Sequence, residues 1–118
     1  MDQKSLPMTS MPITVYKVEI GKGEITEWHE LWTARRPETD EFILCQRHGW
    51  WDEPNKMPRY NVPVLSEPHK TDQAATLAMR DQLERLAKQG WVHQYTLAFD
   101  PTTGGGKGVK LTKPFDIS

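Results

Sequence analysis

Apolar and polar residues alternate in two successive segments near the start of the chain. Residues 13–20 (ITVYKVEI) place apolar side chains on one side of a strand and charged side chains on the other. Residues 25–33 (ITEWHELWT) alternate in the same way, with Trp28 and Trp32 on one face. The turn-forming sequence GKGE separates the two segments, which together predict an antiparallel β-hairpin.

Two further apolar runs predict strands in the first half of the chain. Residues 42–47 (FILCQR) form the third predicted strand, and residues 60–65 (YNVPVL) form a less regular fourth. Pro63 has no N–H group to donate to a neighbouring strand. The fourth strand is therefore expected at an edge of the sheet, or with a bulge.

One helix is predicted, over residues 72–89. Thr71 or Asp72 can cap its first turn. Its apolar residues recur at helical spacing and form one stripe: Ala75, Met79, Leu83 and Leu86. Gly90 stands where a left-handed residue closes a helix, and Trp91 follows it, placed to pack back on the last turn.

Strands are expected again after the helix. The alternation of residues 91–99 (WVHQYTLAF) would place four large side chains on one face: Trp91, Tyr95, Leu97 and Phe99. Residues 102–108 (TTGGGKG) form a connection, and residues 109–111 are a candidate last strand. The order β-β-β-β-α-β, with or without that last strand, predicts an α+β fold. We expect a mainly antiparallel sheet of about five strands with one long helix packed on one face.

Length and charge limit the function classes. A chain of 118 residues fits one domain with one modest core. Fifteen Lys and Arg residues against sixteen Asp and Glu give a formal net charge of -1. A general nucleic-acid coat or a membrane-surface binder usually has a clear basic excess, so only a local basic patch stays open. The single cysteine, Cys45, excludes an intramolecular disulfide and a multi-cysteine metal site.

The N-terminal segment is expected to be a disordered leader. Residues 1–12 contain two prolines and no apolar stretch of the kind that a secretory signal needs. No apolar run in the chain approaches the roughly 20 residues that span a bilayer. We therefore expect a cytoplasmic protein without membrane association, with a single domain over residues 13–118.

No motif fixes an enzymatic chemistry. The GGGK sequence at 104–107 lacks the first glycine and the following Ser or Thr of a phosphate-binding P-loop. The four histidines fall in no metal-binding motif, so neither a metal nor a cofactor is expected. Cys45 continues an apolar run and is expected to be buried, not a nucleophile. Catalysis stays an open alternative, because catalytic groups can converge from distant segments.

The segment over residues 47–60 (RHGWWDEPNKMPRY) is the most suggestive of function, and we predict a loop around its tryptophan pair. Aromatic, cationic and Met side chains make up the candidate partner-binding residues: Arg47, Trp50, Trp51, Lys56, Met57, Arg59 and Tyr60. Trp, Tyr, Met and Arg are enriched in protein interfaces. Aromatics beside cations could also stack on the bases of a single-stranded nucleic acid. A third interpretation buries one or both indoles in the core.

The sequence therefore predicts a small, tryptophan-rich binding module without catalytic activity. The favoured partner is another protein or a second copy of the chain, contacted through the Trp50–Tyr60 loop and an exposed sheet edge. The alternative is a single-stranded nucleic-acid-binding protein that uses the same aromatics with Arg47, Lys56 and Arg59. Asp52 and Glu53 oppose that alternative, because they would repel phosphate. An enzyme with an unrecognised site is the third possibility.

Overall fold

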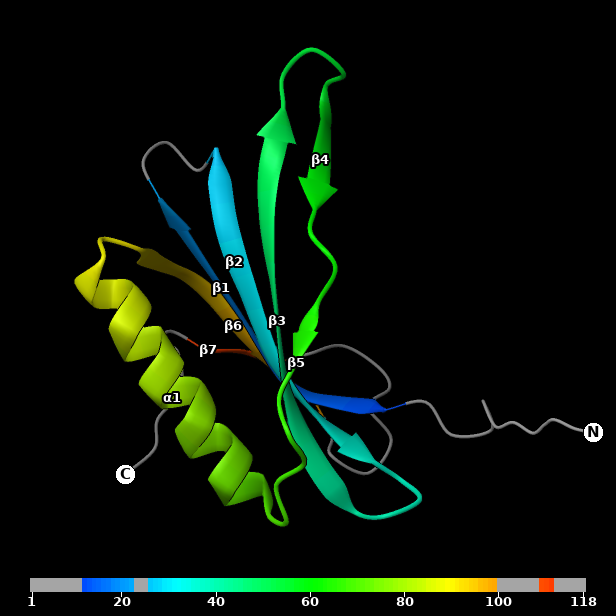
Figure 1. Ribbon diagram of the computed structural model, residues 1–118. Helices are drawn as coiled ribbons and strands as arrows, with labels where there is room; N and C mark the ends of the chain where they lie inside the picture. The colour runs from blue at the N-terminus through cyan, green and yellow to red at the C-terminus, as the bar shows by residue number, and fades with distance from the viewer. Residues whose placement is uncertain (1–11, 23–25, 100–108, 112–118) are drawn as a thin grey trace, which may run out of the picture.

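A twisted antiparallel sheet with one helix across it makes up the fold (Figure 1). The computed structural model describes residues 12–22 and 26–99 with their side chains and residues 109–111 as backbone. Eight elements follow one another along the chain: β1 (Ile13–Lys22), β2 (Glu27–Arg36), β3 (Glu41–Asp52), β4 (Met57–Tyr60), β5 (Val64–Leu65), α1 (Asp72–Lys88), β6 (Val92–Ala98) and β7 (Val109–Leu111).

The strand order across the sheet is β4-β3-β2-β1-β6-β7, and β5 pairs with β3 beyond the end of β4. Every pairing among the described strands is antiparallel. The predicted α+β class, the hairpin of the first two strands and the short last strand are confirmed. None of the described helices is both long and apolar enough to cross a membrane.

The alternation in the strands sorts the side chains into two faces, one of which packs under α1. Strand residues of this face and the predicted stripe of the helix form the main core: Val18, Ile20, Leu31, Met79, Leu83 and Leu86. Full burial of an aliphatic side chain of this size stabilises a fold by roughly 1.5–3 kcal/mol. The core therefore fixes both the position of α1 and the face that each strand turns towards it.

Capping interactions set both ends of α1 where the sequence predicts them. The Thr71 hydroxyl accepts a hydrogen bond from the Ala74 N–H at 3.1 Å. At the other end, the Gly90 backbone has a φ of 95°, and the Trp91 N–H donates to the Leu86 carbonyl at 3.1 Å. This is a Schellman motif, and it turns Trp91 back against the core.

The sequence predicted a loop around the tryptophan pair, and this prediction is wrong. β3 continues to Asp52, so Trp50 and Trp51 are strand residues, and the turn begins only at Glu53. β2 pairs with one side of this strand end and β4 with the other. Large side chains stand on both faces of the strand there, so the sequence shows no alternation that would reveal it.

Two further elements differ from the prediction. The expected fourth strand is divided into β4 and β5, both at the edge of the sheet, as the proline at 63 suggested. Trp91 does not share a face with Tyr95 and Leu97, because it packs on the core under α1. The motif that ends the helix, and a register shift in β6 opposite Glu19 and Ile20, change the face of the sheet towards which the first side chains of this segment point. The predicted connection over 102–108 and the leader, apart from Pro12, lie outside the described residues.

The Schellman motif at Gly90 can be tested directly by its contribution to stability. We expect Gly90→Ala to lower the free energy of unfolding by about 1–2 kcal/mol, because a Cβ disfavours the left-handed conformation. A Cβ at this position would meet no atom within 4 Å, so the cost is conformational and not steric. Gly90→Asn, which tolerates this conformation better, is the matched control and should lose less. Urea denaturation measures both variants, and equal stability of Gly90→Ala and the wild type would contradict the assignment.

Candidate functional site

The face of the sheet opposite α1 carries a second, more polar set of side chains. The antiparallel register places Glu19 of β1, Glu30 of β2 and Arg47 of β3 in one row across the sheet. Lys17 and Trp32 stand in the next row. We refer to this side of the sheet as the second face.

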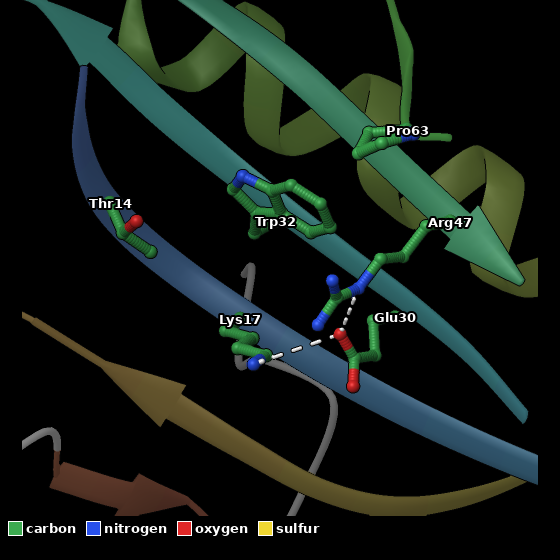
Figure 2. Close-up of a pocket in the computed structure, with 6 residues that line it drawn as sticks. All are labelled: Thr14, Lys17, Glu30, Trp32, Arg47 and Pro63. Atoms are coloured by element: carbon green, nitrogen blue, oxygen red, sulfur yellow. Dashed lines mark hydrogen bonds and ion pairs between the residues drawn. The ribbon is translucent and has the colours of Figure 1, made fainter. Parts of the chain in front are cut away.

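A pocket of about 200 Å³ opens on the second face (Figure 2). Residues from the first three strands and from the link between β4 and β5 line it: Thr14, Lys17, Glu30, Trp32, Arg47 and Pro63. In Figure 2 the Arg47 guanidinium extends into the space between the Trp32 ring and Lys17. The pocket therefore combines two cations, one carboxylate and an aromatic wall.

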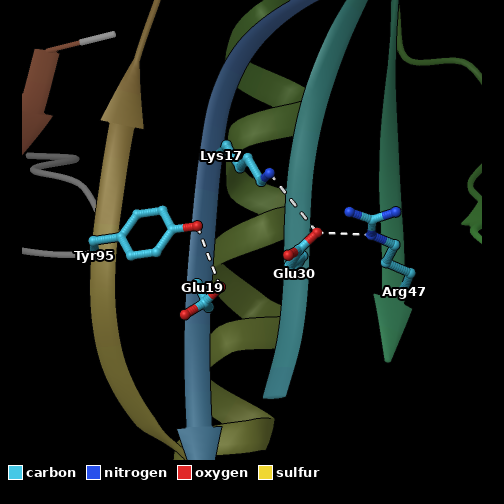
Figure 3. A network of polar contacts seen from close by, with 5 residues as sticks. All are labelled: Lys17, Glu19, Glu30, Arg47 and Tyr95. Atoms are coloured by element: carbon cyan, nitrogen blue, oxygen red, sulfur yellow. Dashed lines mark hydrogen bonds and ion pairs between the residues drawn. The ribbon is translucent and has the colours of Figure 1, made fainter. Parts of the chain in front are cut away.

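The Glu30 carboxylate is the centre of a polar network (Figure 3). Glu30 is only 4% exposed. Its Oε1 lies 2.7 Å from Arg47 Nε and 3.8 Å from Lys17 Nζ. Removing a carboxylate from water costs several kcal/mol unless cations and hydrogen bonds compensate it. The two cations, one from the strand on each side of β2, supply that compensation.

Arg47 is also held by aromatic rings. Its guanidinium carbon lies 3.8 Å from the centre of the Tyr60 ring and 5.8 Å from that of Trp32. Such cation–π contacts contribute about 0.5–2 kcal/mol. A Cβ on Gly49 would stand 2.6 Å from Trp28 Nε1 and 2.9 Å from a carbon of the Tyr60 ring. Glycine at this position therefore lets Tyr60 settle on the sheet beside Arg47.

Glu19 and Tyr95 extend the network on the second face. The Tyr95 hydroxyl donates a hydrogen bond to Glu19 Oε1 at 3.2 Å (Figure 3). Burial, and then the neighbouring Glu30, raise the pKa of Glu19. Burial beside Glu19 raises the pKa of Tyr95 to about 12, so the hydroxyl keeps its proton at neutral pH.

A cluster of aromatic rings lies at the end of β3, on the face of the sheet that carries α1. Trp50 stacks on His48 with ring centres 5.7 Å apart, and Trp91 meets His29 edge-on at 4.5 Å. His48 Nε2 lies 2.9 Å from a Glu27 carboxylate oxygen. Trp50 and Trp51 are successive strand residues and point to opposite faces, so they do not form one aromatic surface.

The tip of the β3–β4 hairpin is dense in ion pairs. Arg59 Nε lies 2.9 Å from Asp52 Oδ2, and Lys56 contacts the Glu53 carboxylate. Hydrogen bonds from Asn55 and then Arg59 lower the pKa of Asp52. The Trp51 indole N–H also donates to Glu53, at 2.9 Å. All three predicted cations, counting Arg47 on Glu30, are thus paired with carboxylates.

Exposed apolar side chains concentrate at the same edge of the sheet. Eight large hydrophobic residues of the described chain are exposed, and only Val92 lies elsewhere. The other seven belong to the end of β3, to β4, to β5 and to their link: Trp50, Trp51, Met57, Tyr60, Val62, Val64 and Leu65. We refer to these seven as the edge surface. Four of the seven predicted site residues belong to it, while Arg47, Lys56 and Arg59 lie beside it.

Prolines remove some of the backbone donors that this edge could offer to a further strand. The N–H groups of Asn61 and Ser66 donate to β3 carbonyls at 2.9 and 2.8 Å. Because backbone groups alternate along a strand, the residues three positions earlier, Pro58 and Pro63, face outward. Prolines at these two positions remove two of the outward N–H groups that strand addition would use. Strand addition is thereby weakened, which favours side chains as the contact with a partner at this edge.

The other chemical candidates have structural explanations. Cys45 is 3% exposed, and burial raises its pKa to about 11, which makes it a poor nucleophile. His93 lies 2.8 Å from the Thr96 hydroxyl and is a hydrogen-bonded sheet residue. Within the part of the chain that the structure describes, no three His, Cys, Asp or Glu side chains could hold a metal ion together.

Sequence reasoning singled out Arg47 and Tyr60 but not the other members of the network: Glu30 and Trp32, which contact Arg47, and Lys17, which contacts Glu30. These partners come from other strands, and only the register brings them together. One signal was present in the sequence: Glu30 lies between two tryptophans on the same face of an alternating strand. A comparison of the chain with known protein families, curated proteins and solved structures found no significant match.

The histidine cluster predicts a pH dependence of stability. Burial, and then the neighbouring His48, lower the pKa of His29 below its ordinary value of 6.5. The folded state therefore favours neutral His29, and its stabilising contribution is complete above pH 6.5 and is lost as the pH falls below it. We expect the free energy of unfolding to decrease from pH 7 to pH 5, and to decrease less in His29→Asn.

A second variant separates His29 from the other perturbed histidine. Burial also lowers the pKa of His93, which contributes a dependence of the same sign. His93→Asn is the control that measures this share, and urea titrations at several pH values compare the three proteins. An unchanged pH slope in His29→Asn would contradict the assignment.

Proposed function

We propose that this chain is a protein-binding module that docks its partner on the edge surface. The observation that carries the proposal is the concentration of seven of eight exposed large hydrophobic residues at one sheet edge. The seven line one edge, with some on each face of the sheet, and exposed apolar side chains gathered in this way on a monomer are typical of interaction sites. Trp, Tyr and Met, the residue types enriched at interface centres, are all among the seven.

The electrostatics of this edge favour a protein over a phosphate backbone. Arg47, Lys56 and Arg59 each have a carboxylate partner within the chain. A phosphate would have to share these cations with the carboxylates that already pair with them, whereas an apolar protein surface leaves the pairs intact. Trp51 and Tyr60 are exposed aromatics that could stack on bases, so single-stranded nucleic acid stays as the alternative function.

The partner is a second protein or a second copy of this chain. The outward prolines favour contact through side chains, with strand addition a smaller contribution. Aromatic and aliphatic anchors that lie on a paired edge are already ordered, so little conformational entropy is lost on docking. These features suit a recognition surface more than a catalytic one.

Site-specific photo-crosslinking tests the proposal. Benzoylphenylalanine is placed at Val64 in one protein and at Val92 in another, because these valines are similarly exposed, at 71% and 61%. We expect discrete crosslinked products from position 64 in extracts of the source cells, and none of the same products from position 92. Excess wild-type protein should compete for the products, and Leu65→Ser should compete several-fold less than the matched control Val92→Ser.

The outcomes distinguish the candidate partners. Products at twice the mass of the chain, also formed by the purified protein, identify self-association. Products that disappear after nuclease treatment, with binding that falls steeply with salt, would replace the proposal by the nucleic-acid alternative. Equal product patterns from positions 64 and 92 would show that the edge surface is not a specific docking site.

A further inference from the structure

The pocket on the second face adjoins the edge surface. Pro63, which lines the pocket, lies between the exposed residues Val62 and Val64. Tyr60, another residue of the edge surface, stacks on the Arg47 guanidinium inside the network. A partner that covers the edge surface therefore reaches the mouth of the pocket.

The pocket carries an excess positive charge. Its lining contains the two cations Lys17 and Arg47 against one carboxylate, Glu30 (Figure 2). Only the Nε of Arg47 is bonded to Glu30. The described residues supply no hydrogen-bond partner for its two terminal nitrogens. Lys17 is 3.8 Å from Glu30, too far for a good hydrogen bond, which leaves its donors available as well.

The size and charge of the pocket restrict its ligand. Pockets for drug-sized ligands measure about 300–1,000 Å³, whereas this one measures about 200 Å³ and fits a group the size of a side chain. One excess positive charge matches a single carboxylate. A phosphate dianion would bring two negative charges against that single excess positive charge, and Glu30 in the pocket and the Glu19 carboxyl in the same row oppose the second.

We propose that this pocket binds the carboxylate of an Asp or Glu side chain presented by the protein that docks on the edge surface. The two terminal nitrogens of Arg47 match the planar geometry of a carboxylate, and Lys17 adds a point charge. Trp32 provides a flat wall for the methylene groups of the side chain. The source of the carboxylate rests on the proposed function, but the chemistry of the pocket can be tested without the partner.

The test uses two capped dipeptides that differ only in charge, acetyl-Phe-Glu-amide and acetyl-Phe-Gln-amide. Each is titrated into the full-length protein while the indole N–H signal of Trp32 is followed by NMR. We expect saturable shifts with the Glu peptide, and at least about tenfold weaker binding of the Gln peptide, because charge-assisted hydrogen bonds are the stronger ones. Inorganic phosphate, a third probe, should bind more weakly than the Glu peptide.

Matched variants identify the cations. Arg47→Met and Lys17→Met should each weaken binding of the Glu peptide at least several-fold. Arg59→Met is the control, because Arg59 is also paired with a carboxylate but lies at the hairpin tip, outside the pocket lining. Glu30→Gln should tighten binding, because it removes the carboxylate that competes for Arg47. Heteronuclear NMR spectra establish whether each variant is folded. If Arg47→Met is unfolded, Lys17→Met, at a partly exposed position, tests the role of the cations instead.

Three results would overturn the proposal: equal affinity for the two peptides, tighter binding of phosphate, or an equal loss in Arg59→Met. The two proposals fail in different ways. If position 64 gives no specific crosslinks while the Glu peptide still binds, the docking surface is wrong and the carboxylate does not come from a docked protein. If specific crosslinks form but the peptides bind alike, the docking surface stands and the pocket proposal is withdrawn.

Discussion

The buried carboxylate of Glu30 needs a cation from the strand on each side of it. Lys17 and Arg47 meet that need only if β1, β2 and β3 keep one register. A shift of one residue would turn Glu30 towards the apolar core under α1 and would turn Leu31 away from it. The ion pairs and the core therefore specify the same register from opposite faces of the sheet. The position of Arg47 then determines where Tyr60, and with it β4, can pack.

The pocket is a consequence of the same requirement. One carboxylate attracts two cations, and the rings of Trp32 and Tyr60 pack on one of them, Arg47. The charge that remains uncompensated faces the pocket, next to the most apolar part of the surface. A stabilising network on the sheet thus also forms the pocket for which we propose a carboxylate ligand. Tyr60 belongs to both features, because its ring packs on Arg47 while the residue stays 39% exposed.

The sequence predicts those parts of the fold that depend on residues close together in the chain. Alternation identifies the first hairpin, and the cap at Thr71 with Gly90 identifies both ends of the helix. The tryptophan pair was misplaced because a strand with large side chains on both faces has no period of two. The network around Glu30 was missed because its members are brought together by register, which no local pattern encodes. A charged residue between two tryptophans on one strand face was the single indication of it.

The paired cations are the reason for proposing a protein, and not a nucleic acid, as the partner of this aromatic-rich edge. Each cation of the segment is already bonded to a carboxylate of the chain, so its field at a distance is that of a dipole and not of a charge. Long-range attraction of a polyanion requires unpaired charge, which the segment does not offer. Short-range contact does not require it, because apolar side chains interact with a partner wherever water can be excluded. In the complex that we propose, specificity has to come from local chemistry, and the pocket beside the edge surface is the place where two cations face one carboxylate.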